Sequence, residues 1–194
     1  RAFRDRAYVG IDASPSLIQH AQHKRLPRAT FLVDDAQALT RLPREQRFGS
    51  ASCILAAQNI AQPERLFRAL SHKLLPGSPL VLTLNHPCFR QPRQSGWGWD
   101  EERKIQYRRI DRYLGTYEMP ILAHPGKDAS IRTLSFHRPV GWYIDELVKA
   151  GFMIDGYEEW SSPAVSDSGP RAKAENIARA EIPLFLGLRA RLAK

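Results

Sequence analysis

Short apolar runs alternate with amphipathic stretches along the first half of the chain. The first run, residues 7–11, ends at Asp12, and apolar residues then recur at helical spacing over 17–21. Ser14 is a favourable N-cap, and Pro15 suits the first helical position because its missing N–H would have no partner there. The segment therefore predicts a buried strand, an acidic residue at its carboxyl end, and a helix that packs against a sheet.

The same alternation continues beyond this unit. Apolar or small-residue strands are predicted at 31–33, 50–57 and 79–84, and an amphipathic helix begins at Pro63. Strands that alternate with helices at this spacing are typical of βαβ units. We therefore expect an α/β fold with a Rossmann-like, doubly wound and mostly parallel sheet.

Residues 87–130 interrupt this rhythm. They hold Trp97, Trp99 and several tyrosines among many charged residues, and we expect a helix over 100–113. Because the insertion follows the carboxyl end of a strand, it is placed to cover a pocket as a lid. The alternative is a peripheral cap whose aromatic side chains pack on the sheet.

Regular structure resumes near residue 132. The pattern predicts a strand at 132–136, a helix over 141–149, a strand over 152–160, a basic helix over 171–181 and a final strand over 182–190. The last two strands follow one another without a buried crossover, so we expect an antiparallel pair at one edge of the sheet. A chain of 194 residues is the size of a single domain, and we treat 1–194 as one.

The composition restricts the class of protein. No apolar run approaches the roughly 20 residues that span a bilayer, so we expect no membrane association. The two cysteines, Cys53 and Cys88, form neither a disulfide framework nor a metal-ligand pair, which favours a cytoplasmic protein. The six histidines are scattered without the spacing of a metal site.

The charge balance is basic. A net charge of +9 favours acidic partners, including nucleic acid. The arginines are nevertheless spread along the chain and often adjoin acids, as at 100–103 and 109–112. A solvated basic surface is therefore the preferred interpretation, and nothing in the pattern indicates the oligomeric state.

Two acidic residues follow successive predicted strands. Asp12 and Asp35 should face one crevice, because the carboxyl ends of parallel strands meet at the same edge of a sheet. A carboxylate at Asp12 can accept hydrogen bonds from both hydroxyls of a ribose, and Asp35 can accept one from an adenine amino group. The Ala36 N–H can reach a ring nitrogen, and Ala13 is one of the apolar neighbours of the base. The pattern predicts an adenosine site without a phosphate-binding glycine loop.

Several stretches resemble one enzyme family. The run VGIDASPSLIQHA resembles the second motif of class I S-adenosylmethionine-dependent methyltransferases, and FLVDDAQAL resembles their next motif. The following two motifs are similar to SCILAAQNI and LLPGSPLVLTL. The later stretches FHRPVGWYIDELVKAGFMIDGYEEW and EIPLFLGLRARL also fit the family. The resemblance covers most of the chain and is greatest to the bacterial small-molecule members often labelled methyltransferase type 11.

The resemblance implies a seven-stranded sheet and S-adenosyl-L-methionine as cofactor. It implies six cofactor-binding residues: Asp12 at the ribose, Asp35 at the adenine amine, Ala13 and Ala36 as apolar or backbone contacts, and Ala57 and Gln58 beside the methionine moiety.

Two departures from the family pattern matter. Asp34 replaces the usual glycine before Asp35 and adds a like charge. The family's first strand and glycine-rich loop, normally upstream of the ribose acid, are not found, so the sequence resembles a member without its N-terminal portion. That strand would lie between the strand ending at Asp12 and the strand at 52–57. We therefore expect the 194-residue chain alone to be inactive, and either poorly soluble or folded without S-adenosylmethionine affinity that calorimetry can measure.

These residues predict methyl transfer to a small molecule by in-line displacement, a reaction that needs mainly positioning. Candidate substrate contacts are Asn59, Asn85, Trp97 and Trp99. His86 and His137 are candidate general bases, because the ordinary histidine pKa is about 6.5; a structural hydrogen bond is the alternative for each.

Two other functions stay open. The first is an RNA methyltransferase, which the positive net charge of the chain would suit. Neither an Asn/Asp-Pro-Pro-Tyr motif nor a recognisable cysteine nucleophile is present, however. The other is a non-catalytic nucleotide-binding or scaffold domain. Cofactor binding separates the scaffold from the enzymes, and salt-dependent RNA binding separates the two enzymes.

Overall fold

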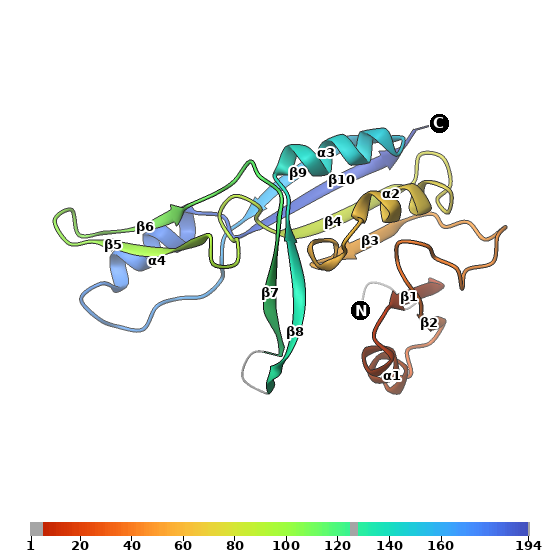
Figure 1. The fold of residues 1–194 in the computed structure, drawn as a ribbon, viewed down its shortest axis with the longest axis horizontal. Helices are drawn as coiled ribbons and strands as arrows, with labels where there is room; N and C mark the ends of the chain where they lie inside the picture. Colours follow the sequence, from red (N-terminus) through yellow and green to blue (C-terminus); the bar gives the residue numbers. More distant parts are fainter. Residues whose placement is uncertain (1–5, 125–127, 194) are drawn as a thin grey trace.

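The computed structural model describes residues 6–124 and 128–193, which form an α/β fold (Figure 1). The chain begins with the predicted strand–helix unit: β1 (Tyr8–Asp12), α1 (Pro15–His23) and β2 (Ala29–Val33). β1 and β2 pair in parallel as a two-stranded sheet. The Ser14 side chain caps α1, as its sequence position predicts.

A four-stranded sheet forms the centre of the molecule. Its strands are β3 (Ala51–Ile54), β4 (Pro79–Asn85), β10 (Phe185–Leu192) and β9 (Phe152–Trp160), in the order β3-β4-β10-β9. β3 runs parallel to β4, whereas β10 is antiparallel to both β4 and β9. It follows that β3, β4 and β9 all end at the same edge of this sheet.

The main core lies between this sheet and two helices, α2 (Pro63–Ser71) and α3 (Val140–Lys149). β4 alternates buried and half-buried residues, so one of its faces meets the helices. Phe67 and Leu147 are fully buried in this core together with leucines of β4 and β10. Each such side chain contributes about 1.5–3 kcal/mol by leaving water, so this face holds the sheet and helices together.

The insertion contains strands where the sequence led us to expect a helix. β5 (Ser95–Asp100) and β6 (Ile105–Ile110) form an antiparallel hairpin, so the helix predicted over 100–113 is wrong. The Tyr107 ring lies across Gly98 of the facing strand, so closely that a Cβ at Gly98 would clash with it. Cross-strand packing of this kind stabilises the hairpin and cannot be read from a local charge pattern.

A second antiparallel hairpin follows, formed by β7 (Tyr117–His124) and β8 (Asp128–His137). The expected insertion boundary at residue 130 therefore falls inside β8. Of the six strand ladders found among the described residues, β1–β2 and β3–β4 are parallel. In the central sheet β3, β4 and β9 run in one direction and β10 in the other, and the two hairpins, which lie outside this sheet, supply the remaining antiparallel ladders.

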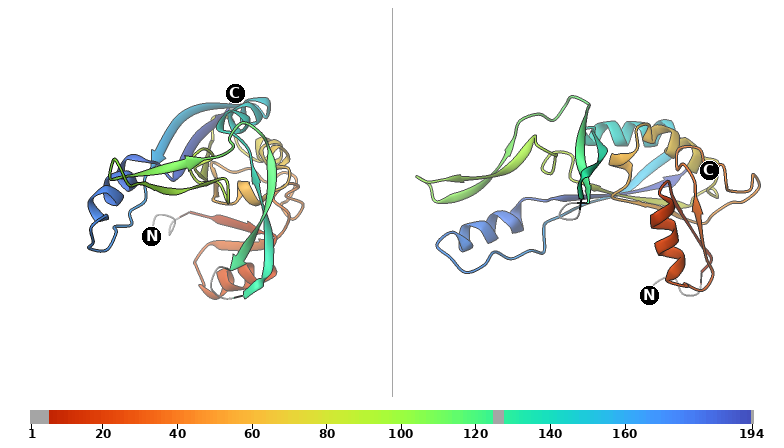
Figure 2. Two further views of the ribbon diagram at one scale, coloured as in Figure 1. Left: turned by 60° about the vertical axis from the view of Figure 1, so that its left-hand side comes forward. Right: turned by 60° about the horizontal axis from the view of Figure 1, so that its bottom comes forward.

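The two hairpins point in different directions from the central sheet (Figures 1 and 2). The β5–β6 hairpin extends to one side together with α4 (Ala172–Glu181), which packs against β6. The β7–β8 hairpin runs past the short 3-10 helix η1 (Ala57–Asn59), which it contacts. No helix in the described parts of the chain is long and apolar enough to cross a membrane.

Candidate adenosine and acceptor site

Asp12 lies at the carboxyl end of β1 and is half-buried. Its Oδ1 accepts a hydrogen bond from the Ser14 N–H at 2.8 Å, which holds the turn into α1. No partner for Oδ2 is found among the described residues. Ala13 is exposed in the same turn. The strand end therefore presents one carboxylate oxygen that can still accept a hydrogen bond.

Asp35 follows β2, the parallel neighbour of β1, so it shares an edge with Asp12. Its carboxylate is exposed and accepts hydrogen bonds from the backbone N–H of Gln37 at 2.8 Å and from the Gln37 side-chain amide at 3.1 Å. Ala36 is half-buried and packs against the main core. The loop thus carries an exposed acid whose present partner is a neutral side chain of its own segment.

Asp34 is buried and organises the same loop. Its Oδ1 accepts hydrogen bonds from the Thr40 hydroxyl at 2.7 Å and from the Asp35 N–H at 2.9 Å, and its Oδ2 accepts one from the Arg41 N–H at 2.7 Å. Burial alone would raise the pKa of Asp34, yet these hydrogen bonds together hold it below its ordinary value. Asp34 is therefore an anchor for the loop that presents Asp35.

The η1 segment follows β3 and begins the connection between the two parallel strands of the central sheet, β3 and β4. Ala57 is fully buried in the main core, whereas Asn59 is exposed. The Gln58 Nε2 donates to the carbonyl of Asn85 at 2.9 Å, and the Asn85 N–H donates to the Gln58 Oε1 at 2.8 Å. This pair of bonds joins η1 to the end of β4 and brings four of the predicted site residues together: Ala57, Gln58, Asn59 and Asn85.

His86 follows Asn85 and is only 3% exposed. Its Nδ1 accepts hydrogen bonds from the N–H groups of Cys88 at 3.1 Å and Phe89 at 3.3 Å. An Nδ1 that accepts must be unprotonated, so Nε2 carries the hydrogen and donates it to the Glu159 Oε1 at 2.7 Å. Both nitrogens of His86 are therefore engaged within the protein.

His137, at the end of β8, is also buried and partnered. Its Nε2 donates to the carbonyl of Tyr113 at 2.7 Å, and its ring stacks on Tyr117 with the ring centroids 4.6 Å apart. Burial lowers its pKa, and the nearby Arg112 and Arg138 act in the same direction, while the hydrogen bond to Tyr113 opposes them. The neutral ring is therefore the favoured form.

Trp97 and Trp99 lie apart from Asp12 and Asp35, on the hairpin that extends to the opposite side of the molecule (Figure 1). Arg108 lies over the Trp97 ring at 4.9 Å, and Arg171 of the segment leading into α4 lies over the Trp99 ring at 4.6 Å. Both indoles are thus packed by cations of the protein itself. The structure does not bring them to the end of β1.

An open cavity of about 500 Å³ lies where the N-termini of α2 and α3 meet the base of the β7–β8 hairpin. Its lining combines aromatic side chains with acids: Glu64, Tyr117, Glu118, Phe136, Trp142 and Glu146. Arg138 forms part of the wall; its Nη2 donates to the carbonyl of Ala61 at 2.6 Å, and its guanidinium lies 4.7 Å from the Trp142 ring centroid. Sequence reasoning missed this cavity, because its walls come from three separate segments.

A second, smaller hollow of about 320 Å³ lies between α2 and the loop after β2. Beside the neutral Gln37, its polar lining residues are of the basic types: Arg65, Arg68, His72 and Lys73. In the described ranges, no group of three or more His, Cys, Asp or Glu side chains is placed to hold a metal ion.

Glu159 and Tyr157, near the end of β9, are the other site residues that the sequence did not reveal. Glu159 accepts hydrogen bonds from His86 and from the Tyr157 hydroxyl. The available signal was an acid at the end of a late strand. Its partnership with His86 spans 73 residues, and no local pattern encodes it.

Solved structures similar to this one are methyltransferases. An S-adenosylmethionine-dependent methyltransferase from Mesorhizobium loti is 28% identical with a TM-score of 0.71, and the match covers 96% of this chain and 81% of the other. A Listeria monocytogenes protein assigned to the same activity is 21% identical with a TM-score of 0.71, over 96% and 80% of the two chains. Neither the family models nor the curated proteins compared with the sequence give a match.

The chain has the class I methyltransferase fold. This agrees with the family resemblance of its motifs. The glycopeptide N-methyltransferase MtfA shares the fold at 16% identity and a TM-score of 0.57, over 96% of this chain and 78% of its own. MtfA has been crystallised with S-adenosyl-L-methionine, sinefungin and S-adenosyl-L-homocysteine.

Within the methyltransferase fold, the residues at the ends of β1 and β2 suit an adenosine. A ribose offers two hydroxyl donors, and Asp12 has an oxygen free to accept from them. The adenine amino group is a hydrogen-bond donor. The exposed Asp35 carboxylate already accepts a hydrogen bond from another NH2 group, the side-chain amide of Gln37. The donor and acceptor types therefore match the cofactor that the fold implies.

Proposed function

We propose that this protein is an S-adenosyl-L-methionine-dependent methyltransferase that acts on a small molecule. The observation that carries the proposal is the free Asp12 oxygen at the end of β1, held by the Ser14 turn in a fold shared with methyltransferases. Asp12 and Ala13 would hold the ribose side of the cofactor, and Asp35 and Ala36 the adenine. The bound cofactor supplies a methyl group that is already activated for transfer.

The rest of the site has the task of positioning the acceptor. Gln58, fixed to the end of β4, and the exposed Asn59 would lie beside the methionine part of the cofactor. Ala57 supports them from the core. Asn85 and His86 would border the acceptor side. We assign His86 to holding Glu159, and His137 to holding the hairpin, because their ring nitrogens are engaged there.

We further propose the seven-stranded arrangement of the family for the sheet. β1 has a strand neighbour on one side only, which is β2, and β3 likewise has only β4; the other edge of each strand has no partner among the described residues. An additional parallel strand between them would give one continuous sheet. This arrangement would place Asp12 and Gln58 at a common edge.

The cavity beside α2 and α3 supports a small-molecule acceptor. Its volume of about 500 Å³ falls within the range typical of small-ligand sites. Its aromatic walls suit an organic molecule, and its three glutamates would repel a phosphate backbone. The insertion, residues 87–130, follows the end of β4 and would cover the acceptor there. Its Trp97 and Trp99 would then act by stiffening the β5–β6 hairpin.

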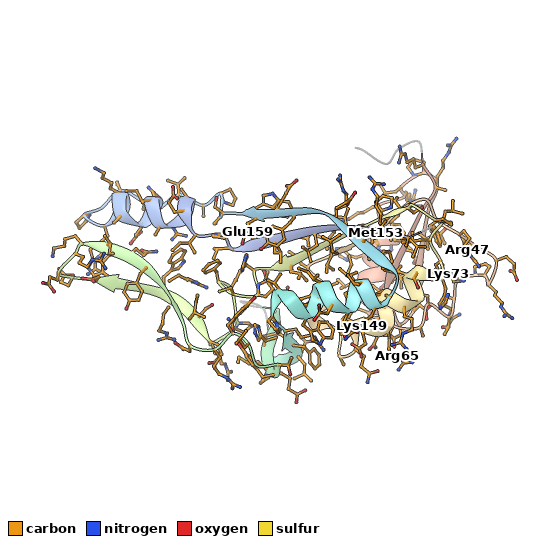
Figure 3. All side chains as sticks on the ribbon, turned by 90° about the horizontal axis from the view of Figure 1, so that it is seen from above. Arg47, Arg65, Lys73, Lys149, Met153 and Glu159 are labelled. Atoms are coloured by element: carbon orange, nitrogen blue, oxygen red, sulfur yellow. The ribbon has the colours of Figure 1, made fainter. Side chains whose placement is uncertain are left out.

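An RNA acceptor is the second candidate, favoured by the basic hollow along α2. Figure 3 shows Arg65 and Lys73 of this hollow, together with Arg47, at the end of the molecule remote from Glu159. Binding of RNA through such a surface would weaken steeply as salt rises. Retention of a short RNA only at low salt, without methylation, would leave the small-molecule proposal standing.

The test is a nuclear magnetic resonance titration of the 15N-labelled chain with S-adenosyl-L-homocysteine. Because β1 and β2 pair and hold Asp12 and Asp35 at one edge, we expect the amide signals of residues 12–14 and 35–37 to shift at millimolar ligand. Binding this weak escapes calorimetry and is compatible with the lack of measurable affinity expected from the sequence. S-inosyl-L-homocysteine, which lacks the adenine amine, should shift 12–14 and spare the Asp35 loop. Shifts confined to other parts of the chain, or none for either ligand, would contradict the proposal.

A further inference from the structure

Glu159 is a carboxylate held firmly by one of its oxygens only. The Nε2–H of the buried His86 donates to Oε1 at 2.7 Å, and the Tyr157 hydroxyl donates to the same oxygen at 3.2 Å. No hydrogen-bond partner for Oε2 is found in the described parts of the chain. The Glu159 side chain is 40% exposed, so this second oxygen can be reached from solvent.

The position of Glu159 places it at the edge of the sheet that binds ligands. β9 runs parallel to β4 because both are antiparallel to β10, so Glu159 and Asn85 end their strands on the same side. His86 joins the two strand ends, since it follows Asn85 and donates to Glu159. Figure 3 shows Glu159 where the central sheet meets the β5–β6 and α4 extension.

The charge on Glu159 is not neutralised by the protein. Its ion-pair partner is His86, whose Nδ1 accepts two backbone hydrogen bonds, so this ring is neutral. Among the described residues no Lys or Arg nitrogen lies within 4 Å of its carboxylate. The chain has 29 Lys and Arg residues against 20 Asp and Glu residues. Other acidic side chains do pair with arginines; Asp155, for example, pairs with Arg189 and Arg191.

The surroundings of this free charge are aromatic. Phe89 packs against His86 with the ring centroids 4.7 Å apart, and Tyr157 borders the carboxylate itself. Burial, together with the negative charge of Glu159, raises the pKa of Tyr157 to about 12, so its hydroxyl stays protonated and continues to donate. A fixed carboxylate beside aromatic rings is the combination that binds organic ammonium groups.

We propose that Glu159 is the specificity-determining residue that binds an ammonium group of the acceptor, with His86 and Tyr157 holding it in place. The assignment of this ammonium group to the methyl acceptor rests on the proposed function. The binding chemistry itself does not, because it needs no cofactor.

The probe is phenethylammonium, compared with 3-phenylpropionate, which has a similar shape and the opposite charge. Each is titrated into the 15N-labelled chain while the amide signals of residues 157–160 are followed. We expect phenethylammonium to shift these signals and phenylpropionate to leave them in place. Equal shifts with both probes would overturn the proposal, and so would the absence of shifts with phenethylammonium.

The matched variants are Glu159→Gln and Glu158→Gln. Glutamine at 159 keeps an oxygen that can accept from His86 and Tyr157 while removing the charge, so the fold is preserved. Glu158 is the neighbouring acid on the opposite face of β9, where it accepts from the Trp160 indole. We expect E159Q to weaken phenethylammonium binding by about tenfold or more, the scale of a lost charge-assisted contact, and E158Q to leave it unchanged.

Two results would overturn the assignment: equal affinity in E159Q and the unaltered chain, or equal losses in E158Q and E159Q. Failure of the proposed function would look different. In that case S-adenosyl-L-homocysteine would leave residues 12–14 and 35–37 unshifted, while the phenethylammonium results could still follow the pattern expected here.

Discussion

The Gln58 side chain and the Asn85 backbone exchange two hydrogen bonds across 27 residues of sequence. The side-chain amide of Gln58 pairs with both backbone groups of Asn85, as a neighbouring strand would. The contact fixes η1 against the end of β4, which is where the parallel pair β3–β4 opens towards ligands.

Gln58→Ala should therefore destabilise the protein by about 1–3 kcal/mol, because two half-buried backbone groups of Asn85 lose their partners. Denaturant unfolding followed by circular dichroism measures the change. Asn59→Ala removes an exposed amide from the same helix and serves as the control. Equal stability of the two variants would show that the Gln58–Asn85 pair does not hold η1.

Asp34→Asn should loosen the loop after β2, because an amide supplies one acceptor oxygen where the carboxylate serves three donors. The expected cost at neutral pH is about 1–3 kcal/mol. The pKa of Asp34 is lowered in the folded protein, so its stabilising effect is complete above the unfolded value of about 3.9 and disappears as the pH falls through the folded value.

Unfolding free energies of the unaltered chain and of D34N, measured from pH 7 down to acid, check this sign. The two curves should converge as the pH falls below about 4. A constant difference across the whole range would mean that the ionised form of Asp34 has no special role. Asp35→Asn is the control, since Asp35 is exposed.

His137→Phe tests the buried histidine of the β8 end. Phenylalanine can still stack on Tyr117 but cannot donate to the Tyr113 carbonyl, so the variant should be less stable at pH 7 by about 0.5–1.5 kcal/mol. The pKa of His137 is lowered on folding, so its neutral form stabilises the protein above the unfolded value of about 6.5, and this stability is lost as the pH falls below it.

The free energy of unfolding should accordingly fall less steeply between about pH 7 and 5 in H137F than in the unaltered chain. His20→Gln, at an exposed position of α1, should retain the steeper dependence. If H137F and the unaltered chain respond to pH in parallel, another group is responsible for the dependence.

Arg171→Ala should free the β5–β6 hairpin from the segment that leads into α4. The Arg171 guanidinium lies over Trp99, and Arg171 Nη2 also lies 3.5 Å from the Glu101 carboxylate. An exposed cation–π contact contributes about 0.5–1 kcal/mol, so amide hydrogen exchange in β5 and β6 should accelerate a few-fold. Lys173→Ala, on the exposed surface of α4, should leave the exchange unchanged. If the amide protons of β5 and β6 exchange as slowly in R171A as in the unaltered chain, Arg171 does not anchor the hairpin.

Local periodicity predicted the regular elements well. The Ser14–Pro15 start of α1, the Pro63 start of α2 and the helix over 141–149 are all present, because capping and apolar spacing act within a few residues. The β5–β6 hairpin was not predicted. Its stability depends on Tyr107 crossing Gly98 and on the register between two strands, which are non-local properties.

The sequence could predict only those parts of the candidate site that depend on a single residue at the end of a strand. Asp12 and Asp35 lie at adjacent strand ends, as their positions after apolar runs suggest. The sequence presented Asp34 as a departure from a glycine and a source of repulsion. The structure instead gives this residue three hydrogen-bond donors. Glu159 depends on a contact with His86 that only the folded chain creates.

The most direct test of the cofactor site compares Asp12→Asn with the unaltered chain in the S-adenosyl-L-homocysteine titration. Asparagine keeps an oxygen for the Ser14 N–H but loses the charge that would bind the ribose hydroxyls. We expect binding weaker by about 1.5–3 kcal/mol, the scale of hydrogen bonds to a charged group, with the fold unchanged. Asp145→Asn, on the exposed face of α3, should bind like the unaltered chain. Equal affinity of folded D12N and the unaltered chain would contradict the central claim that Asp12 holds the cofactor.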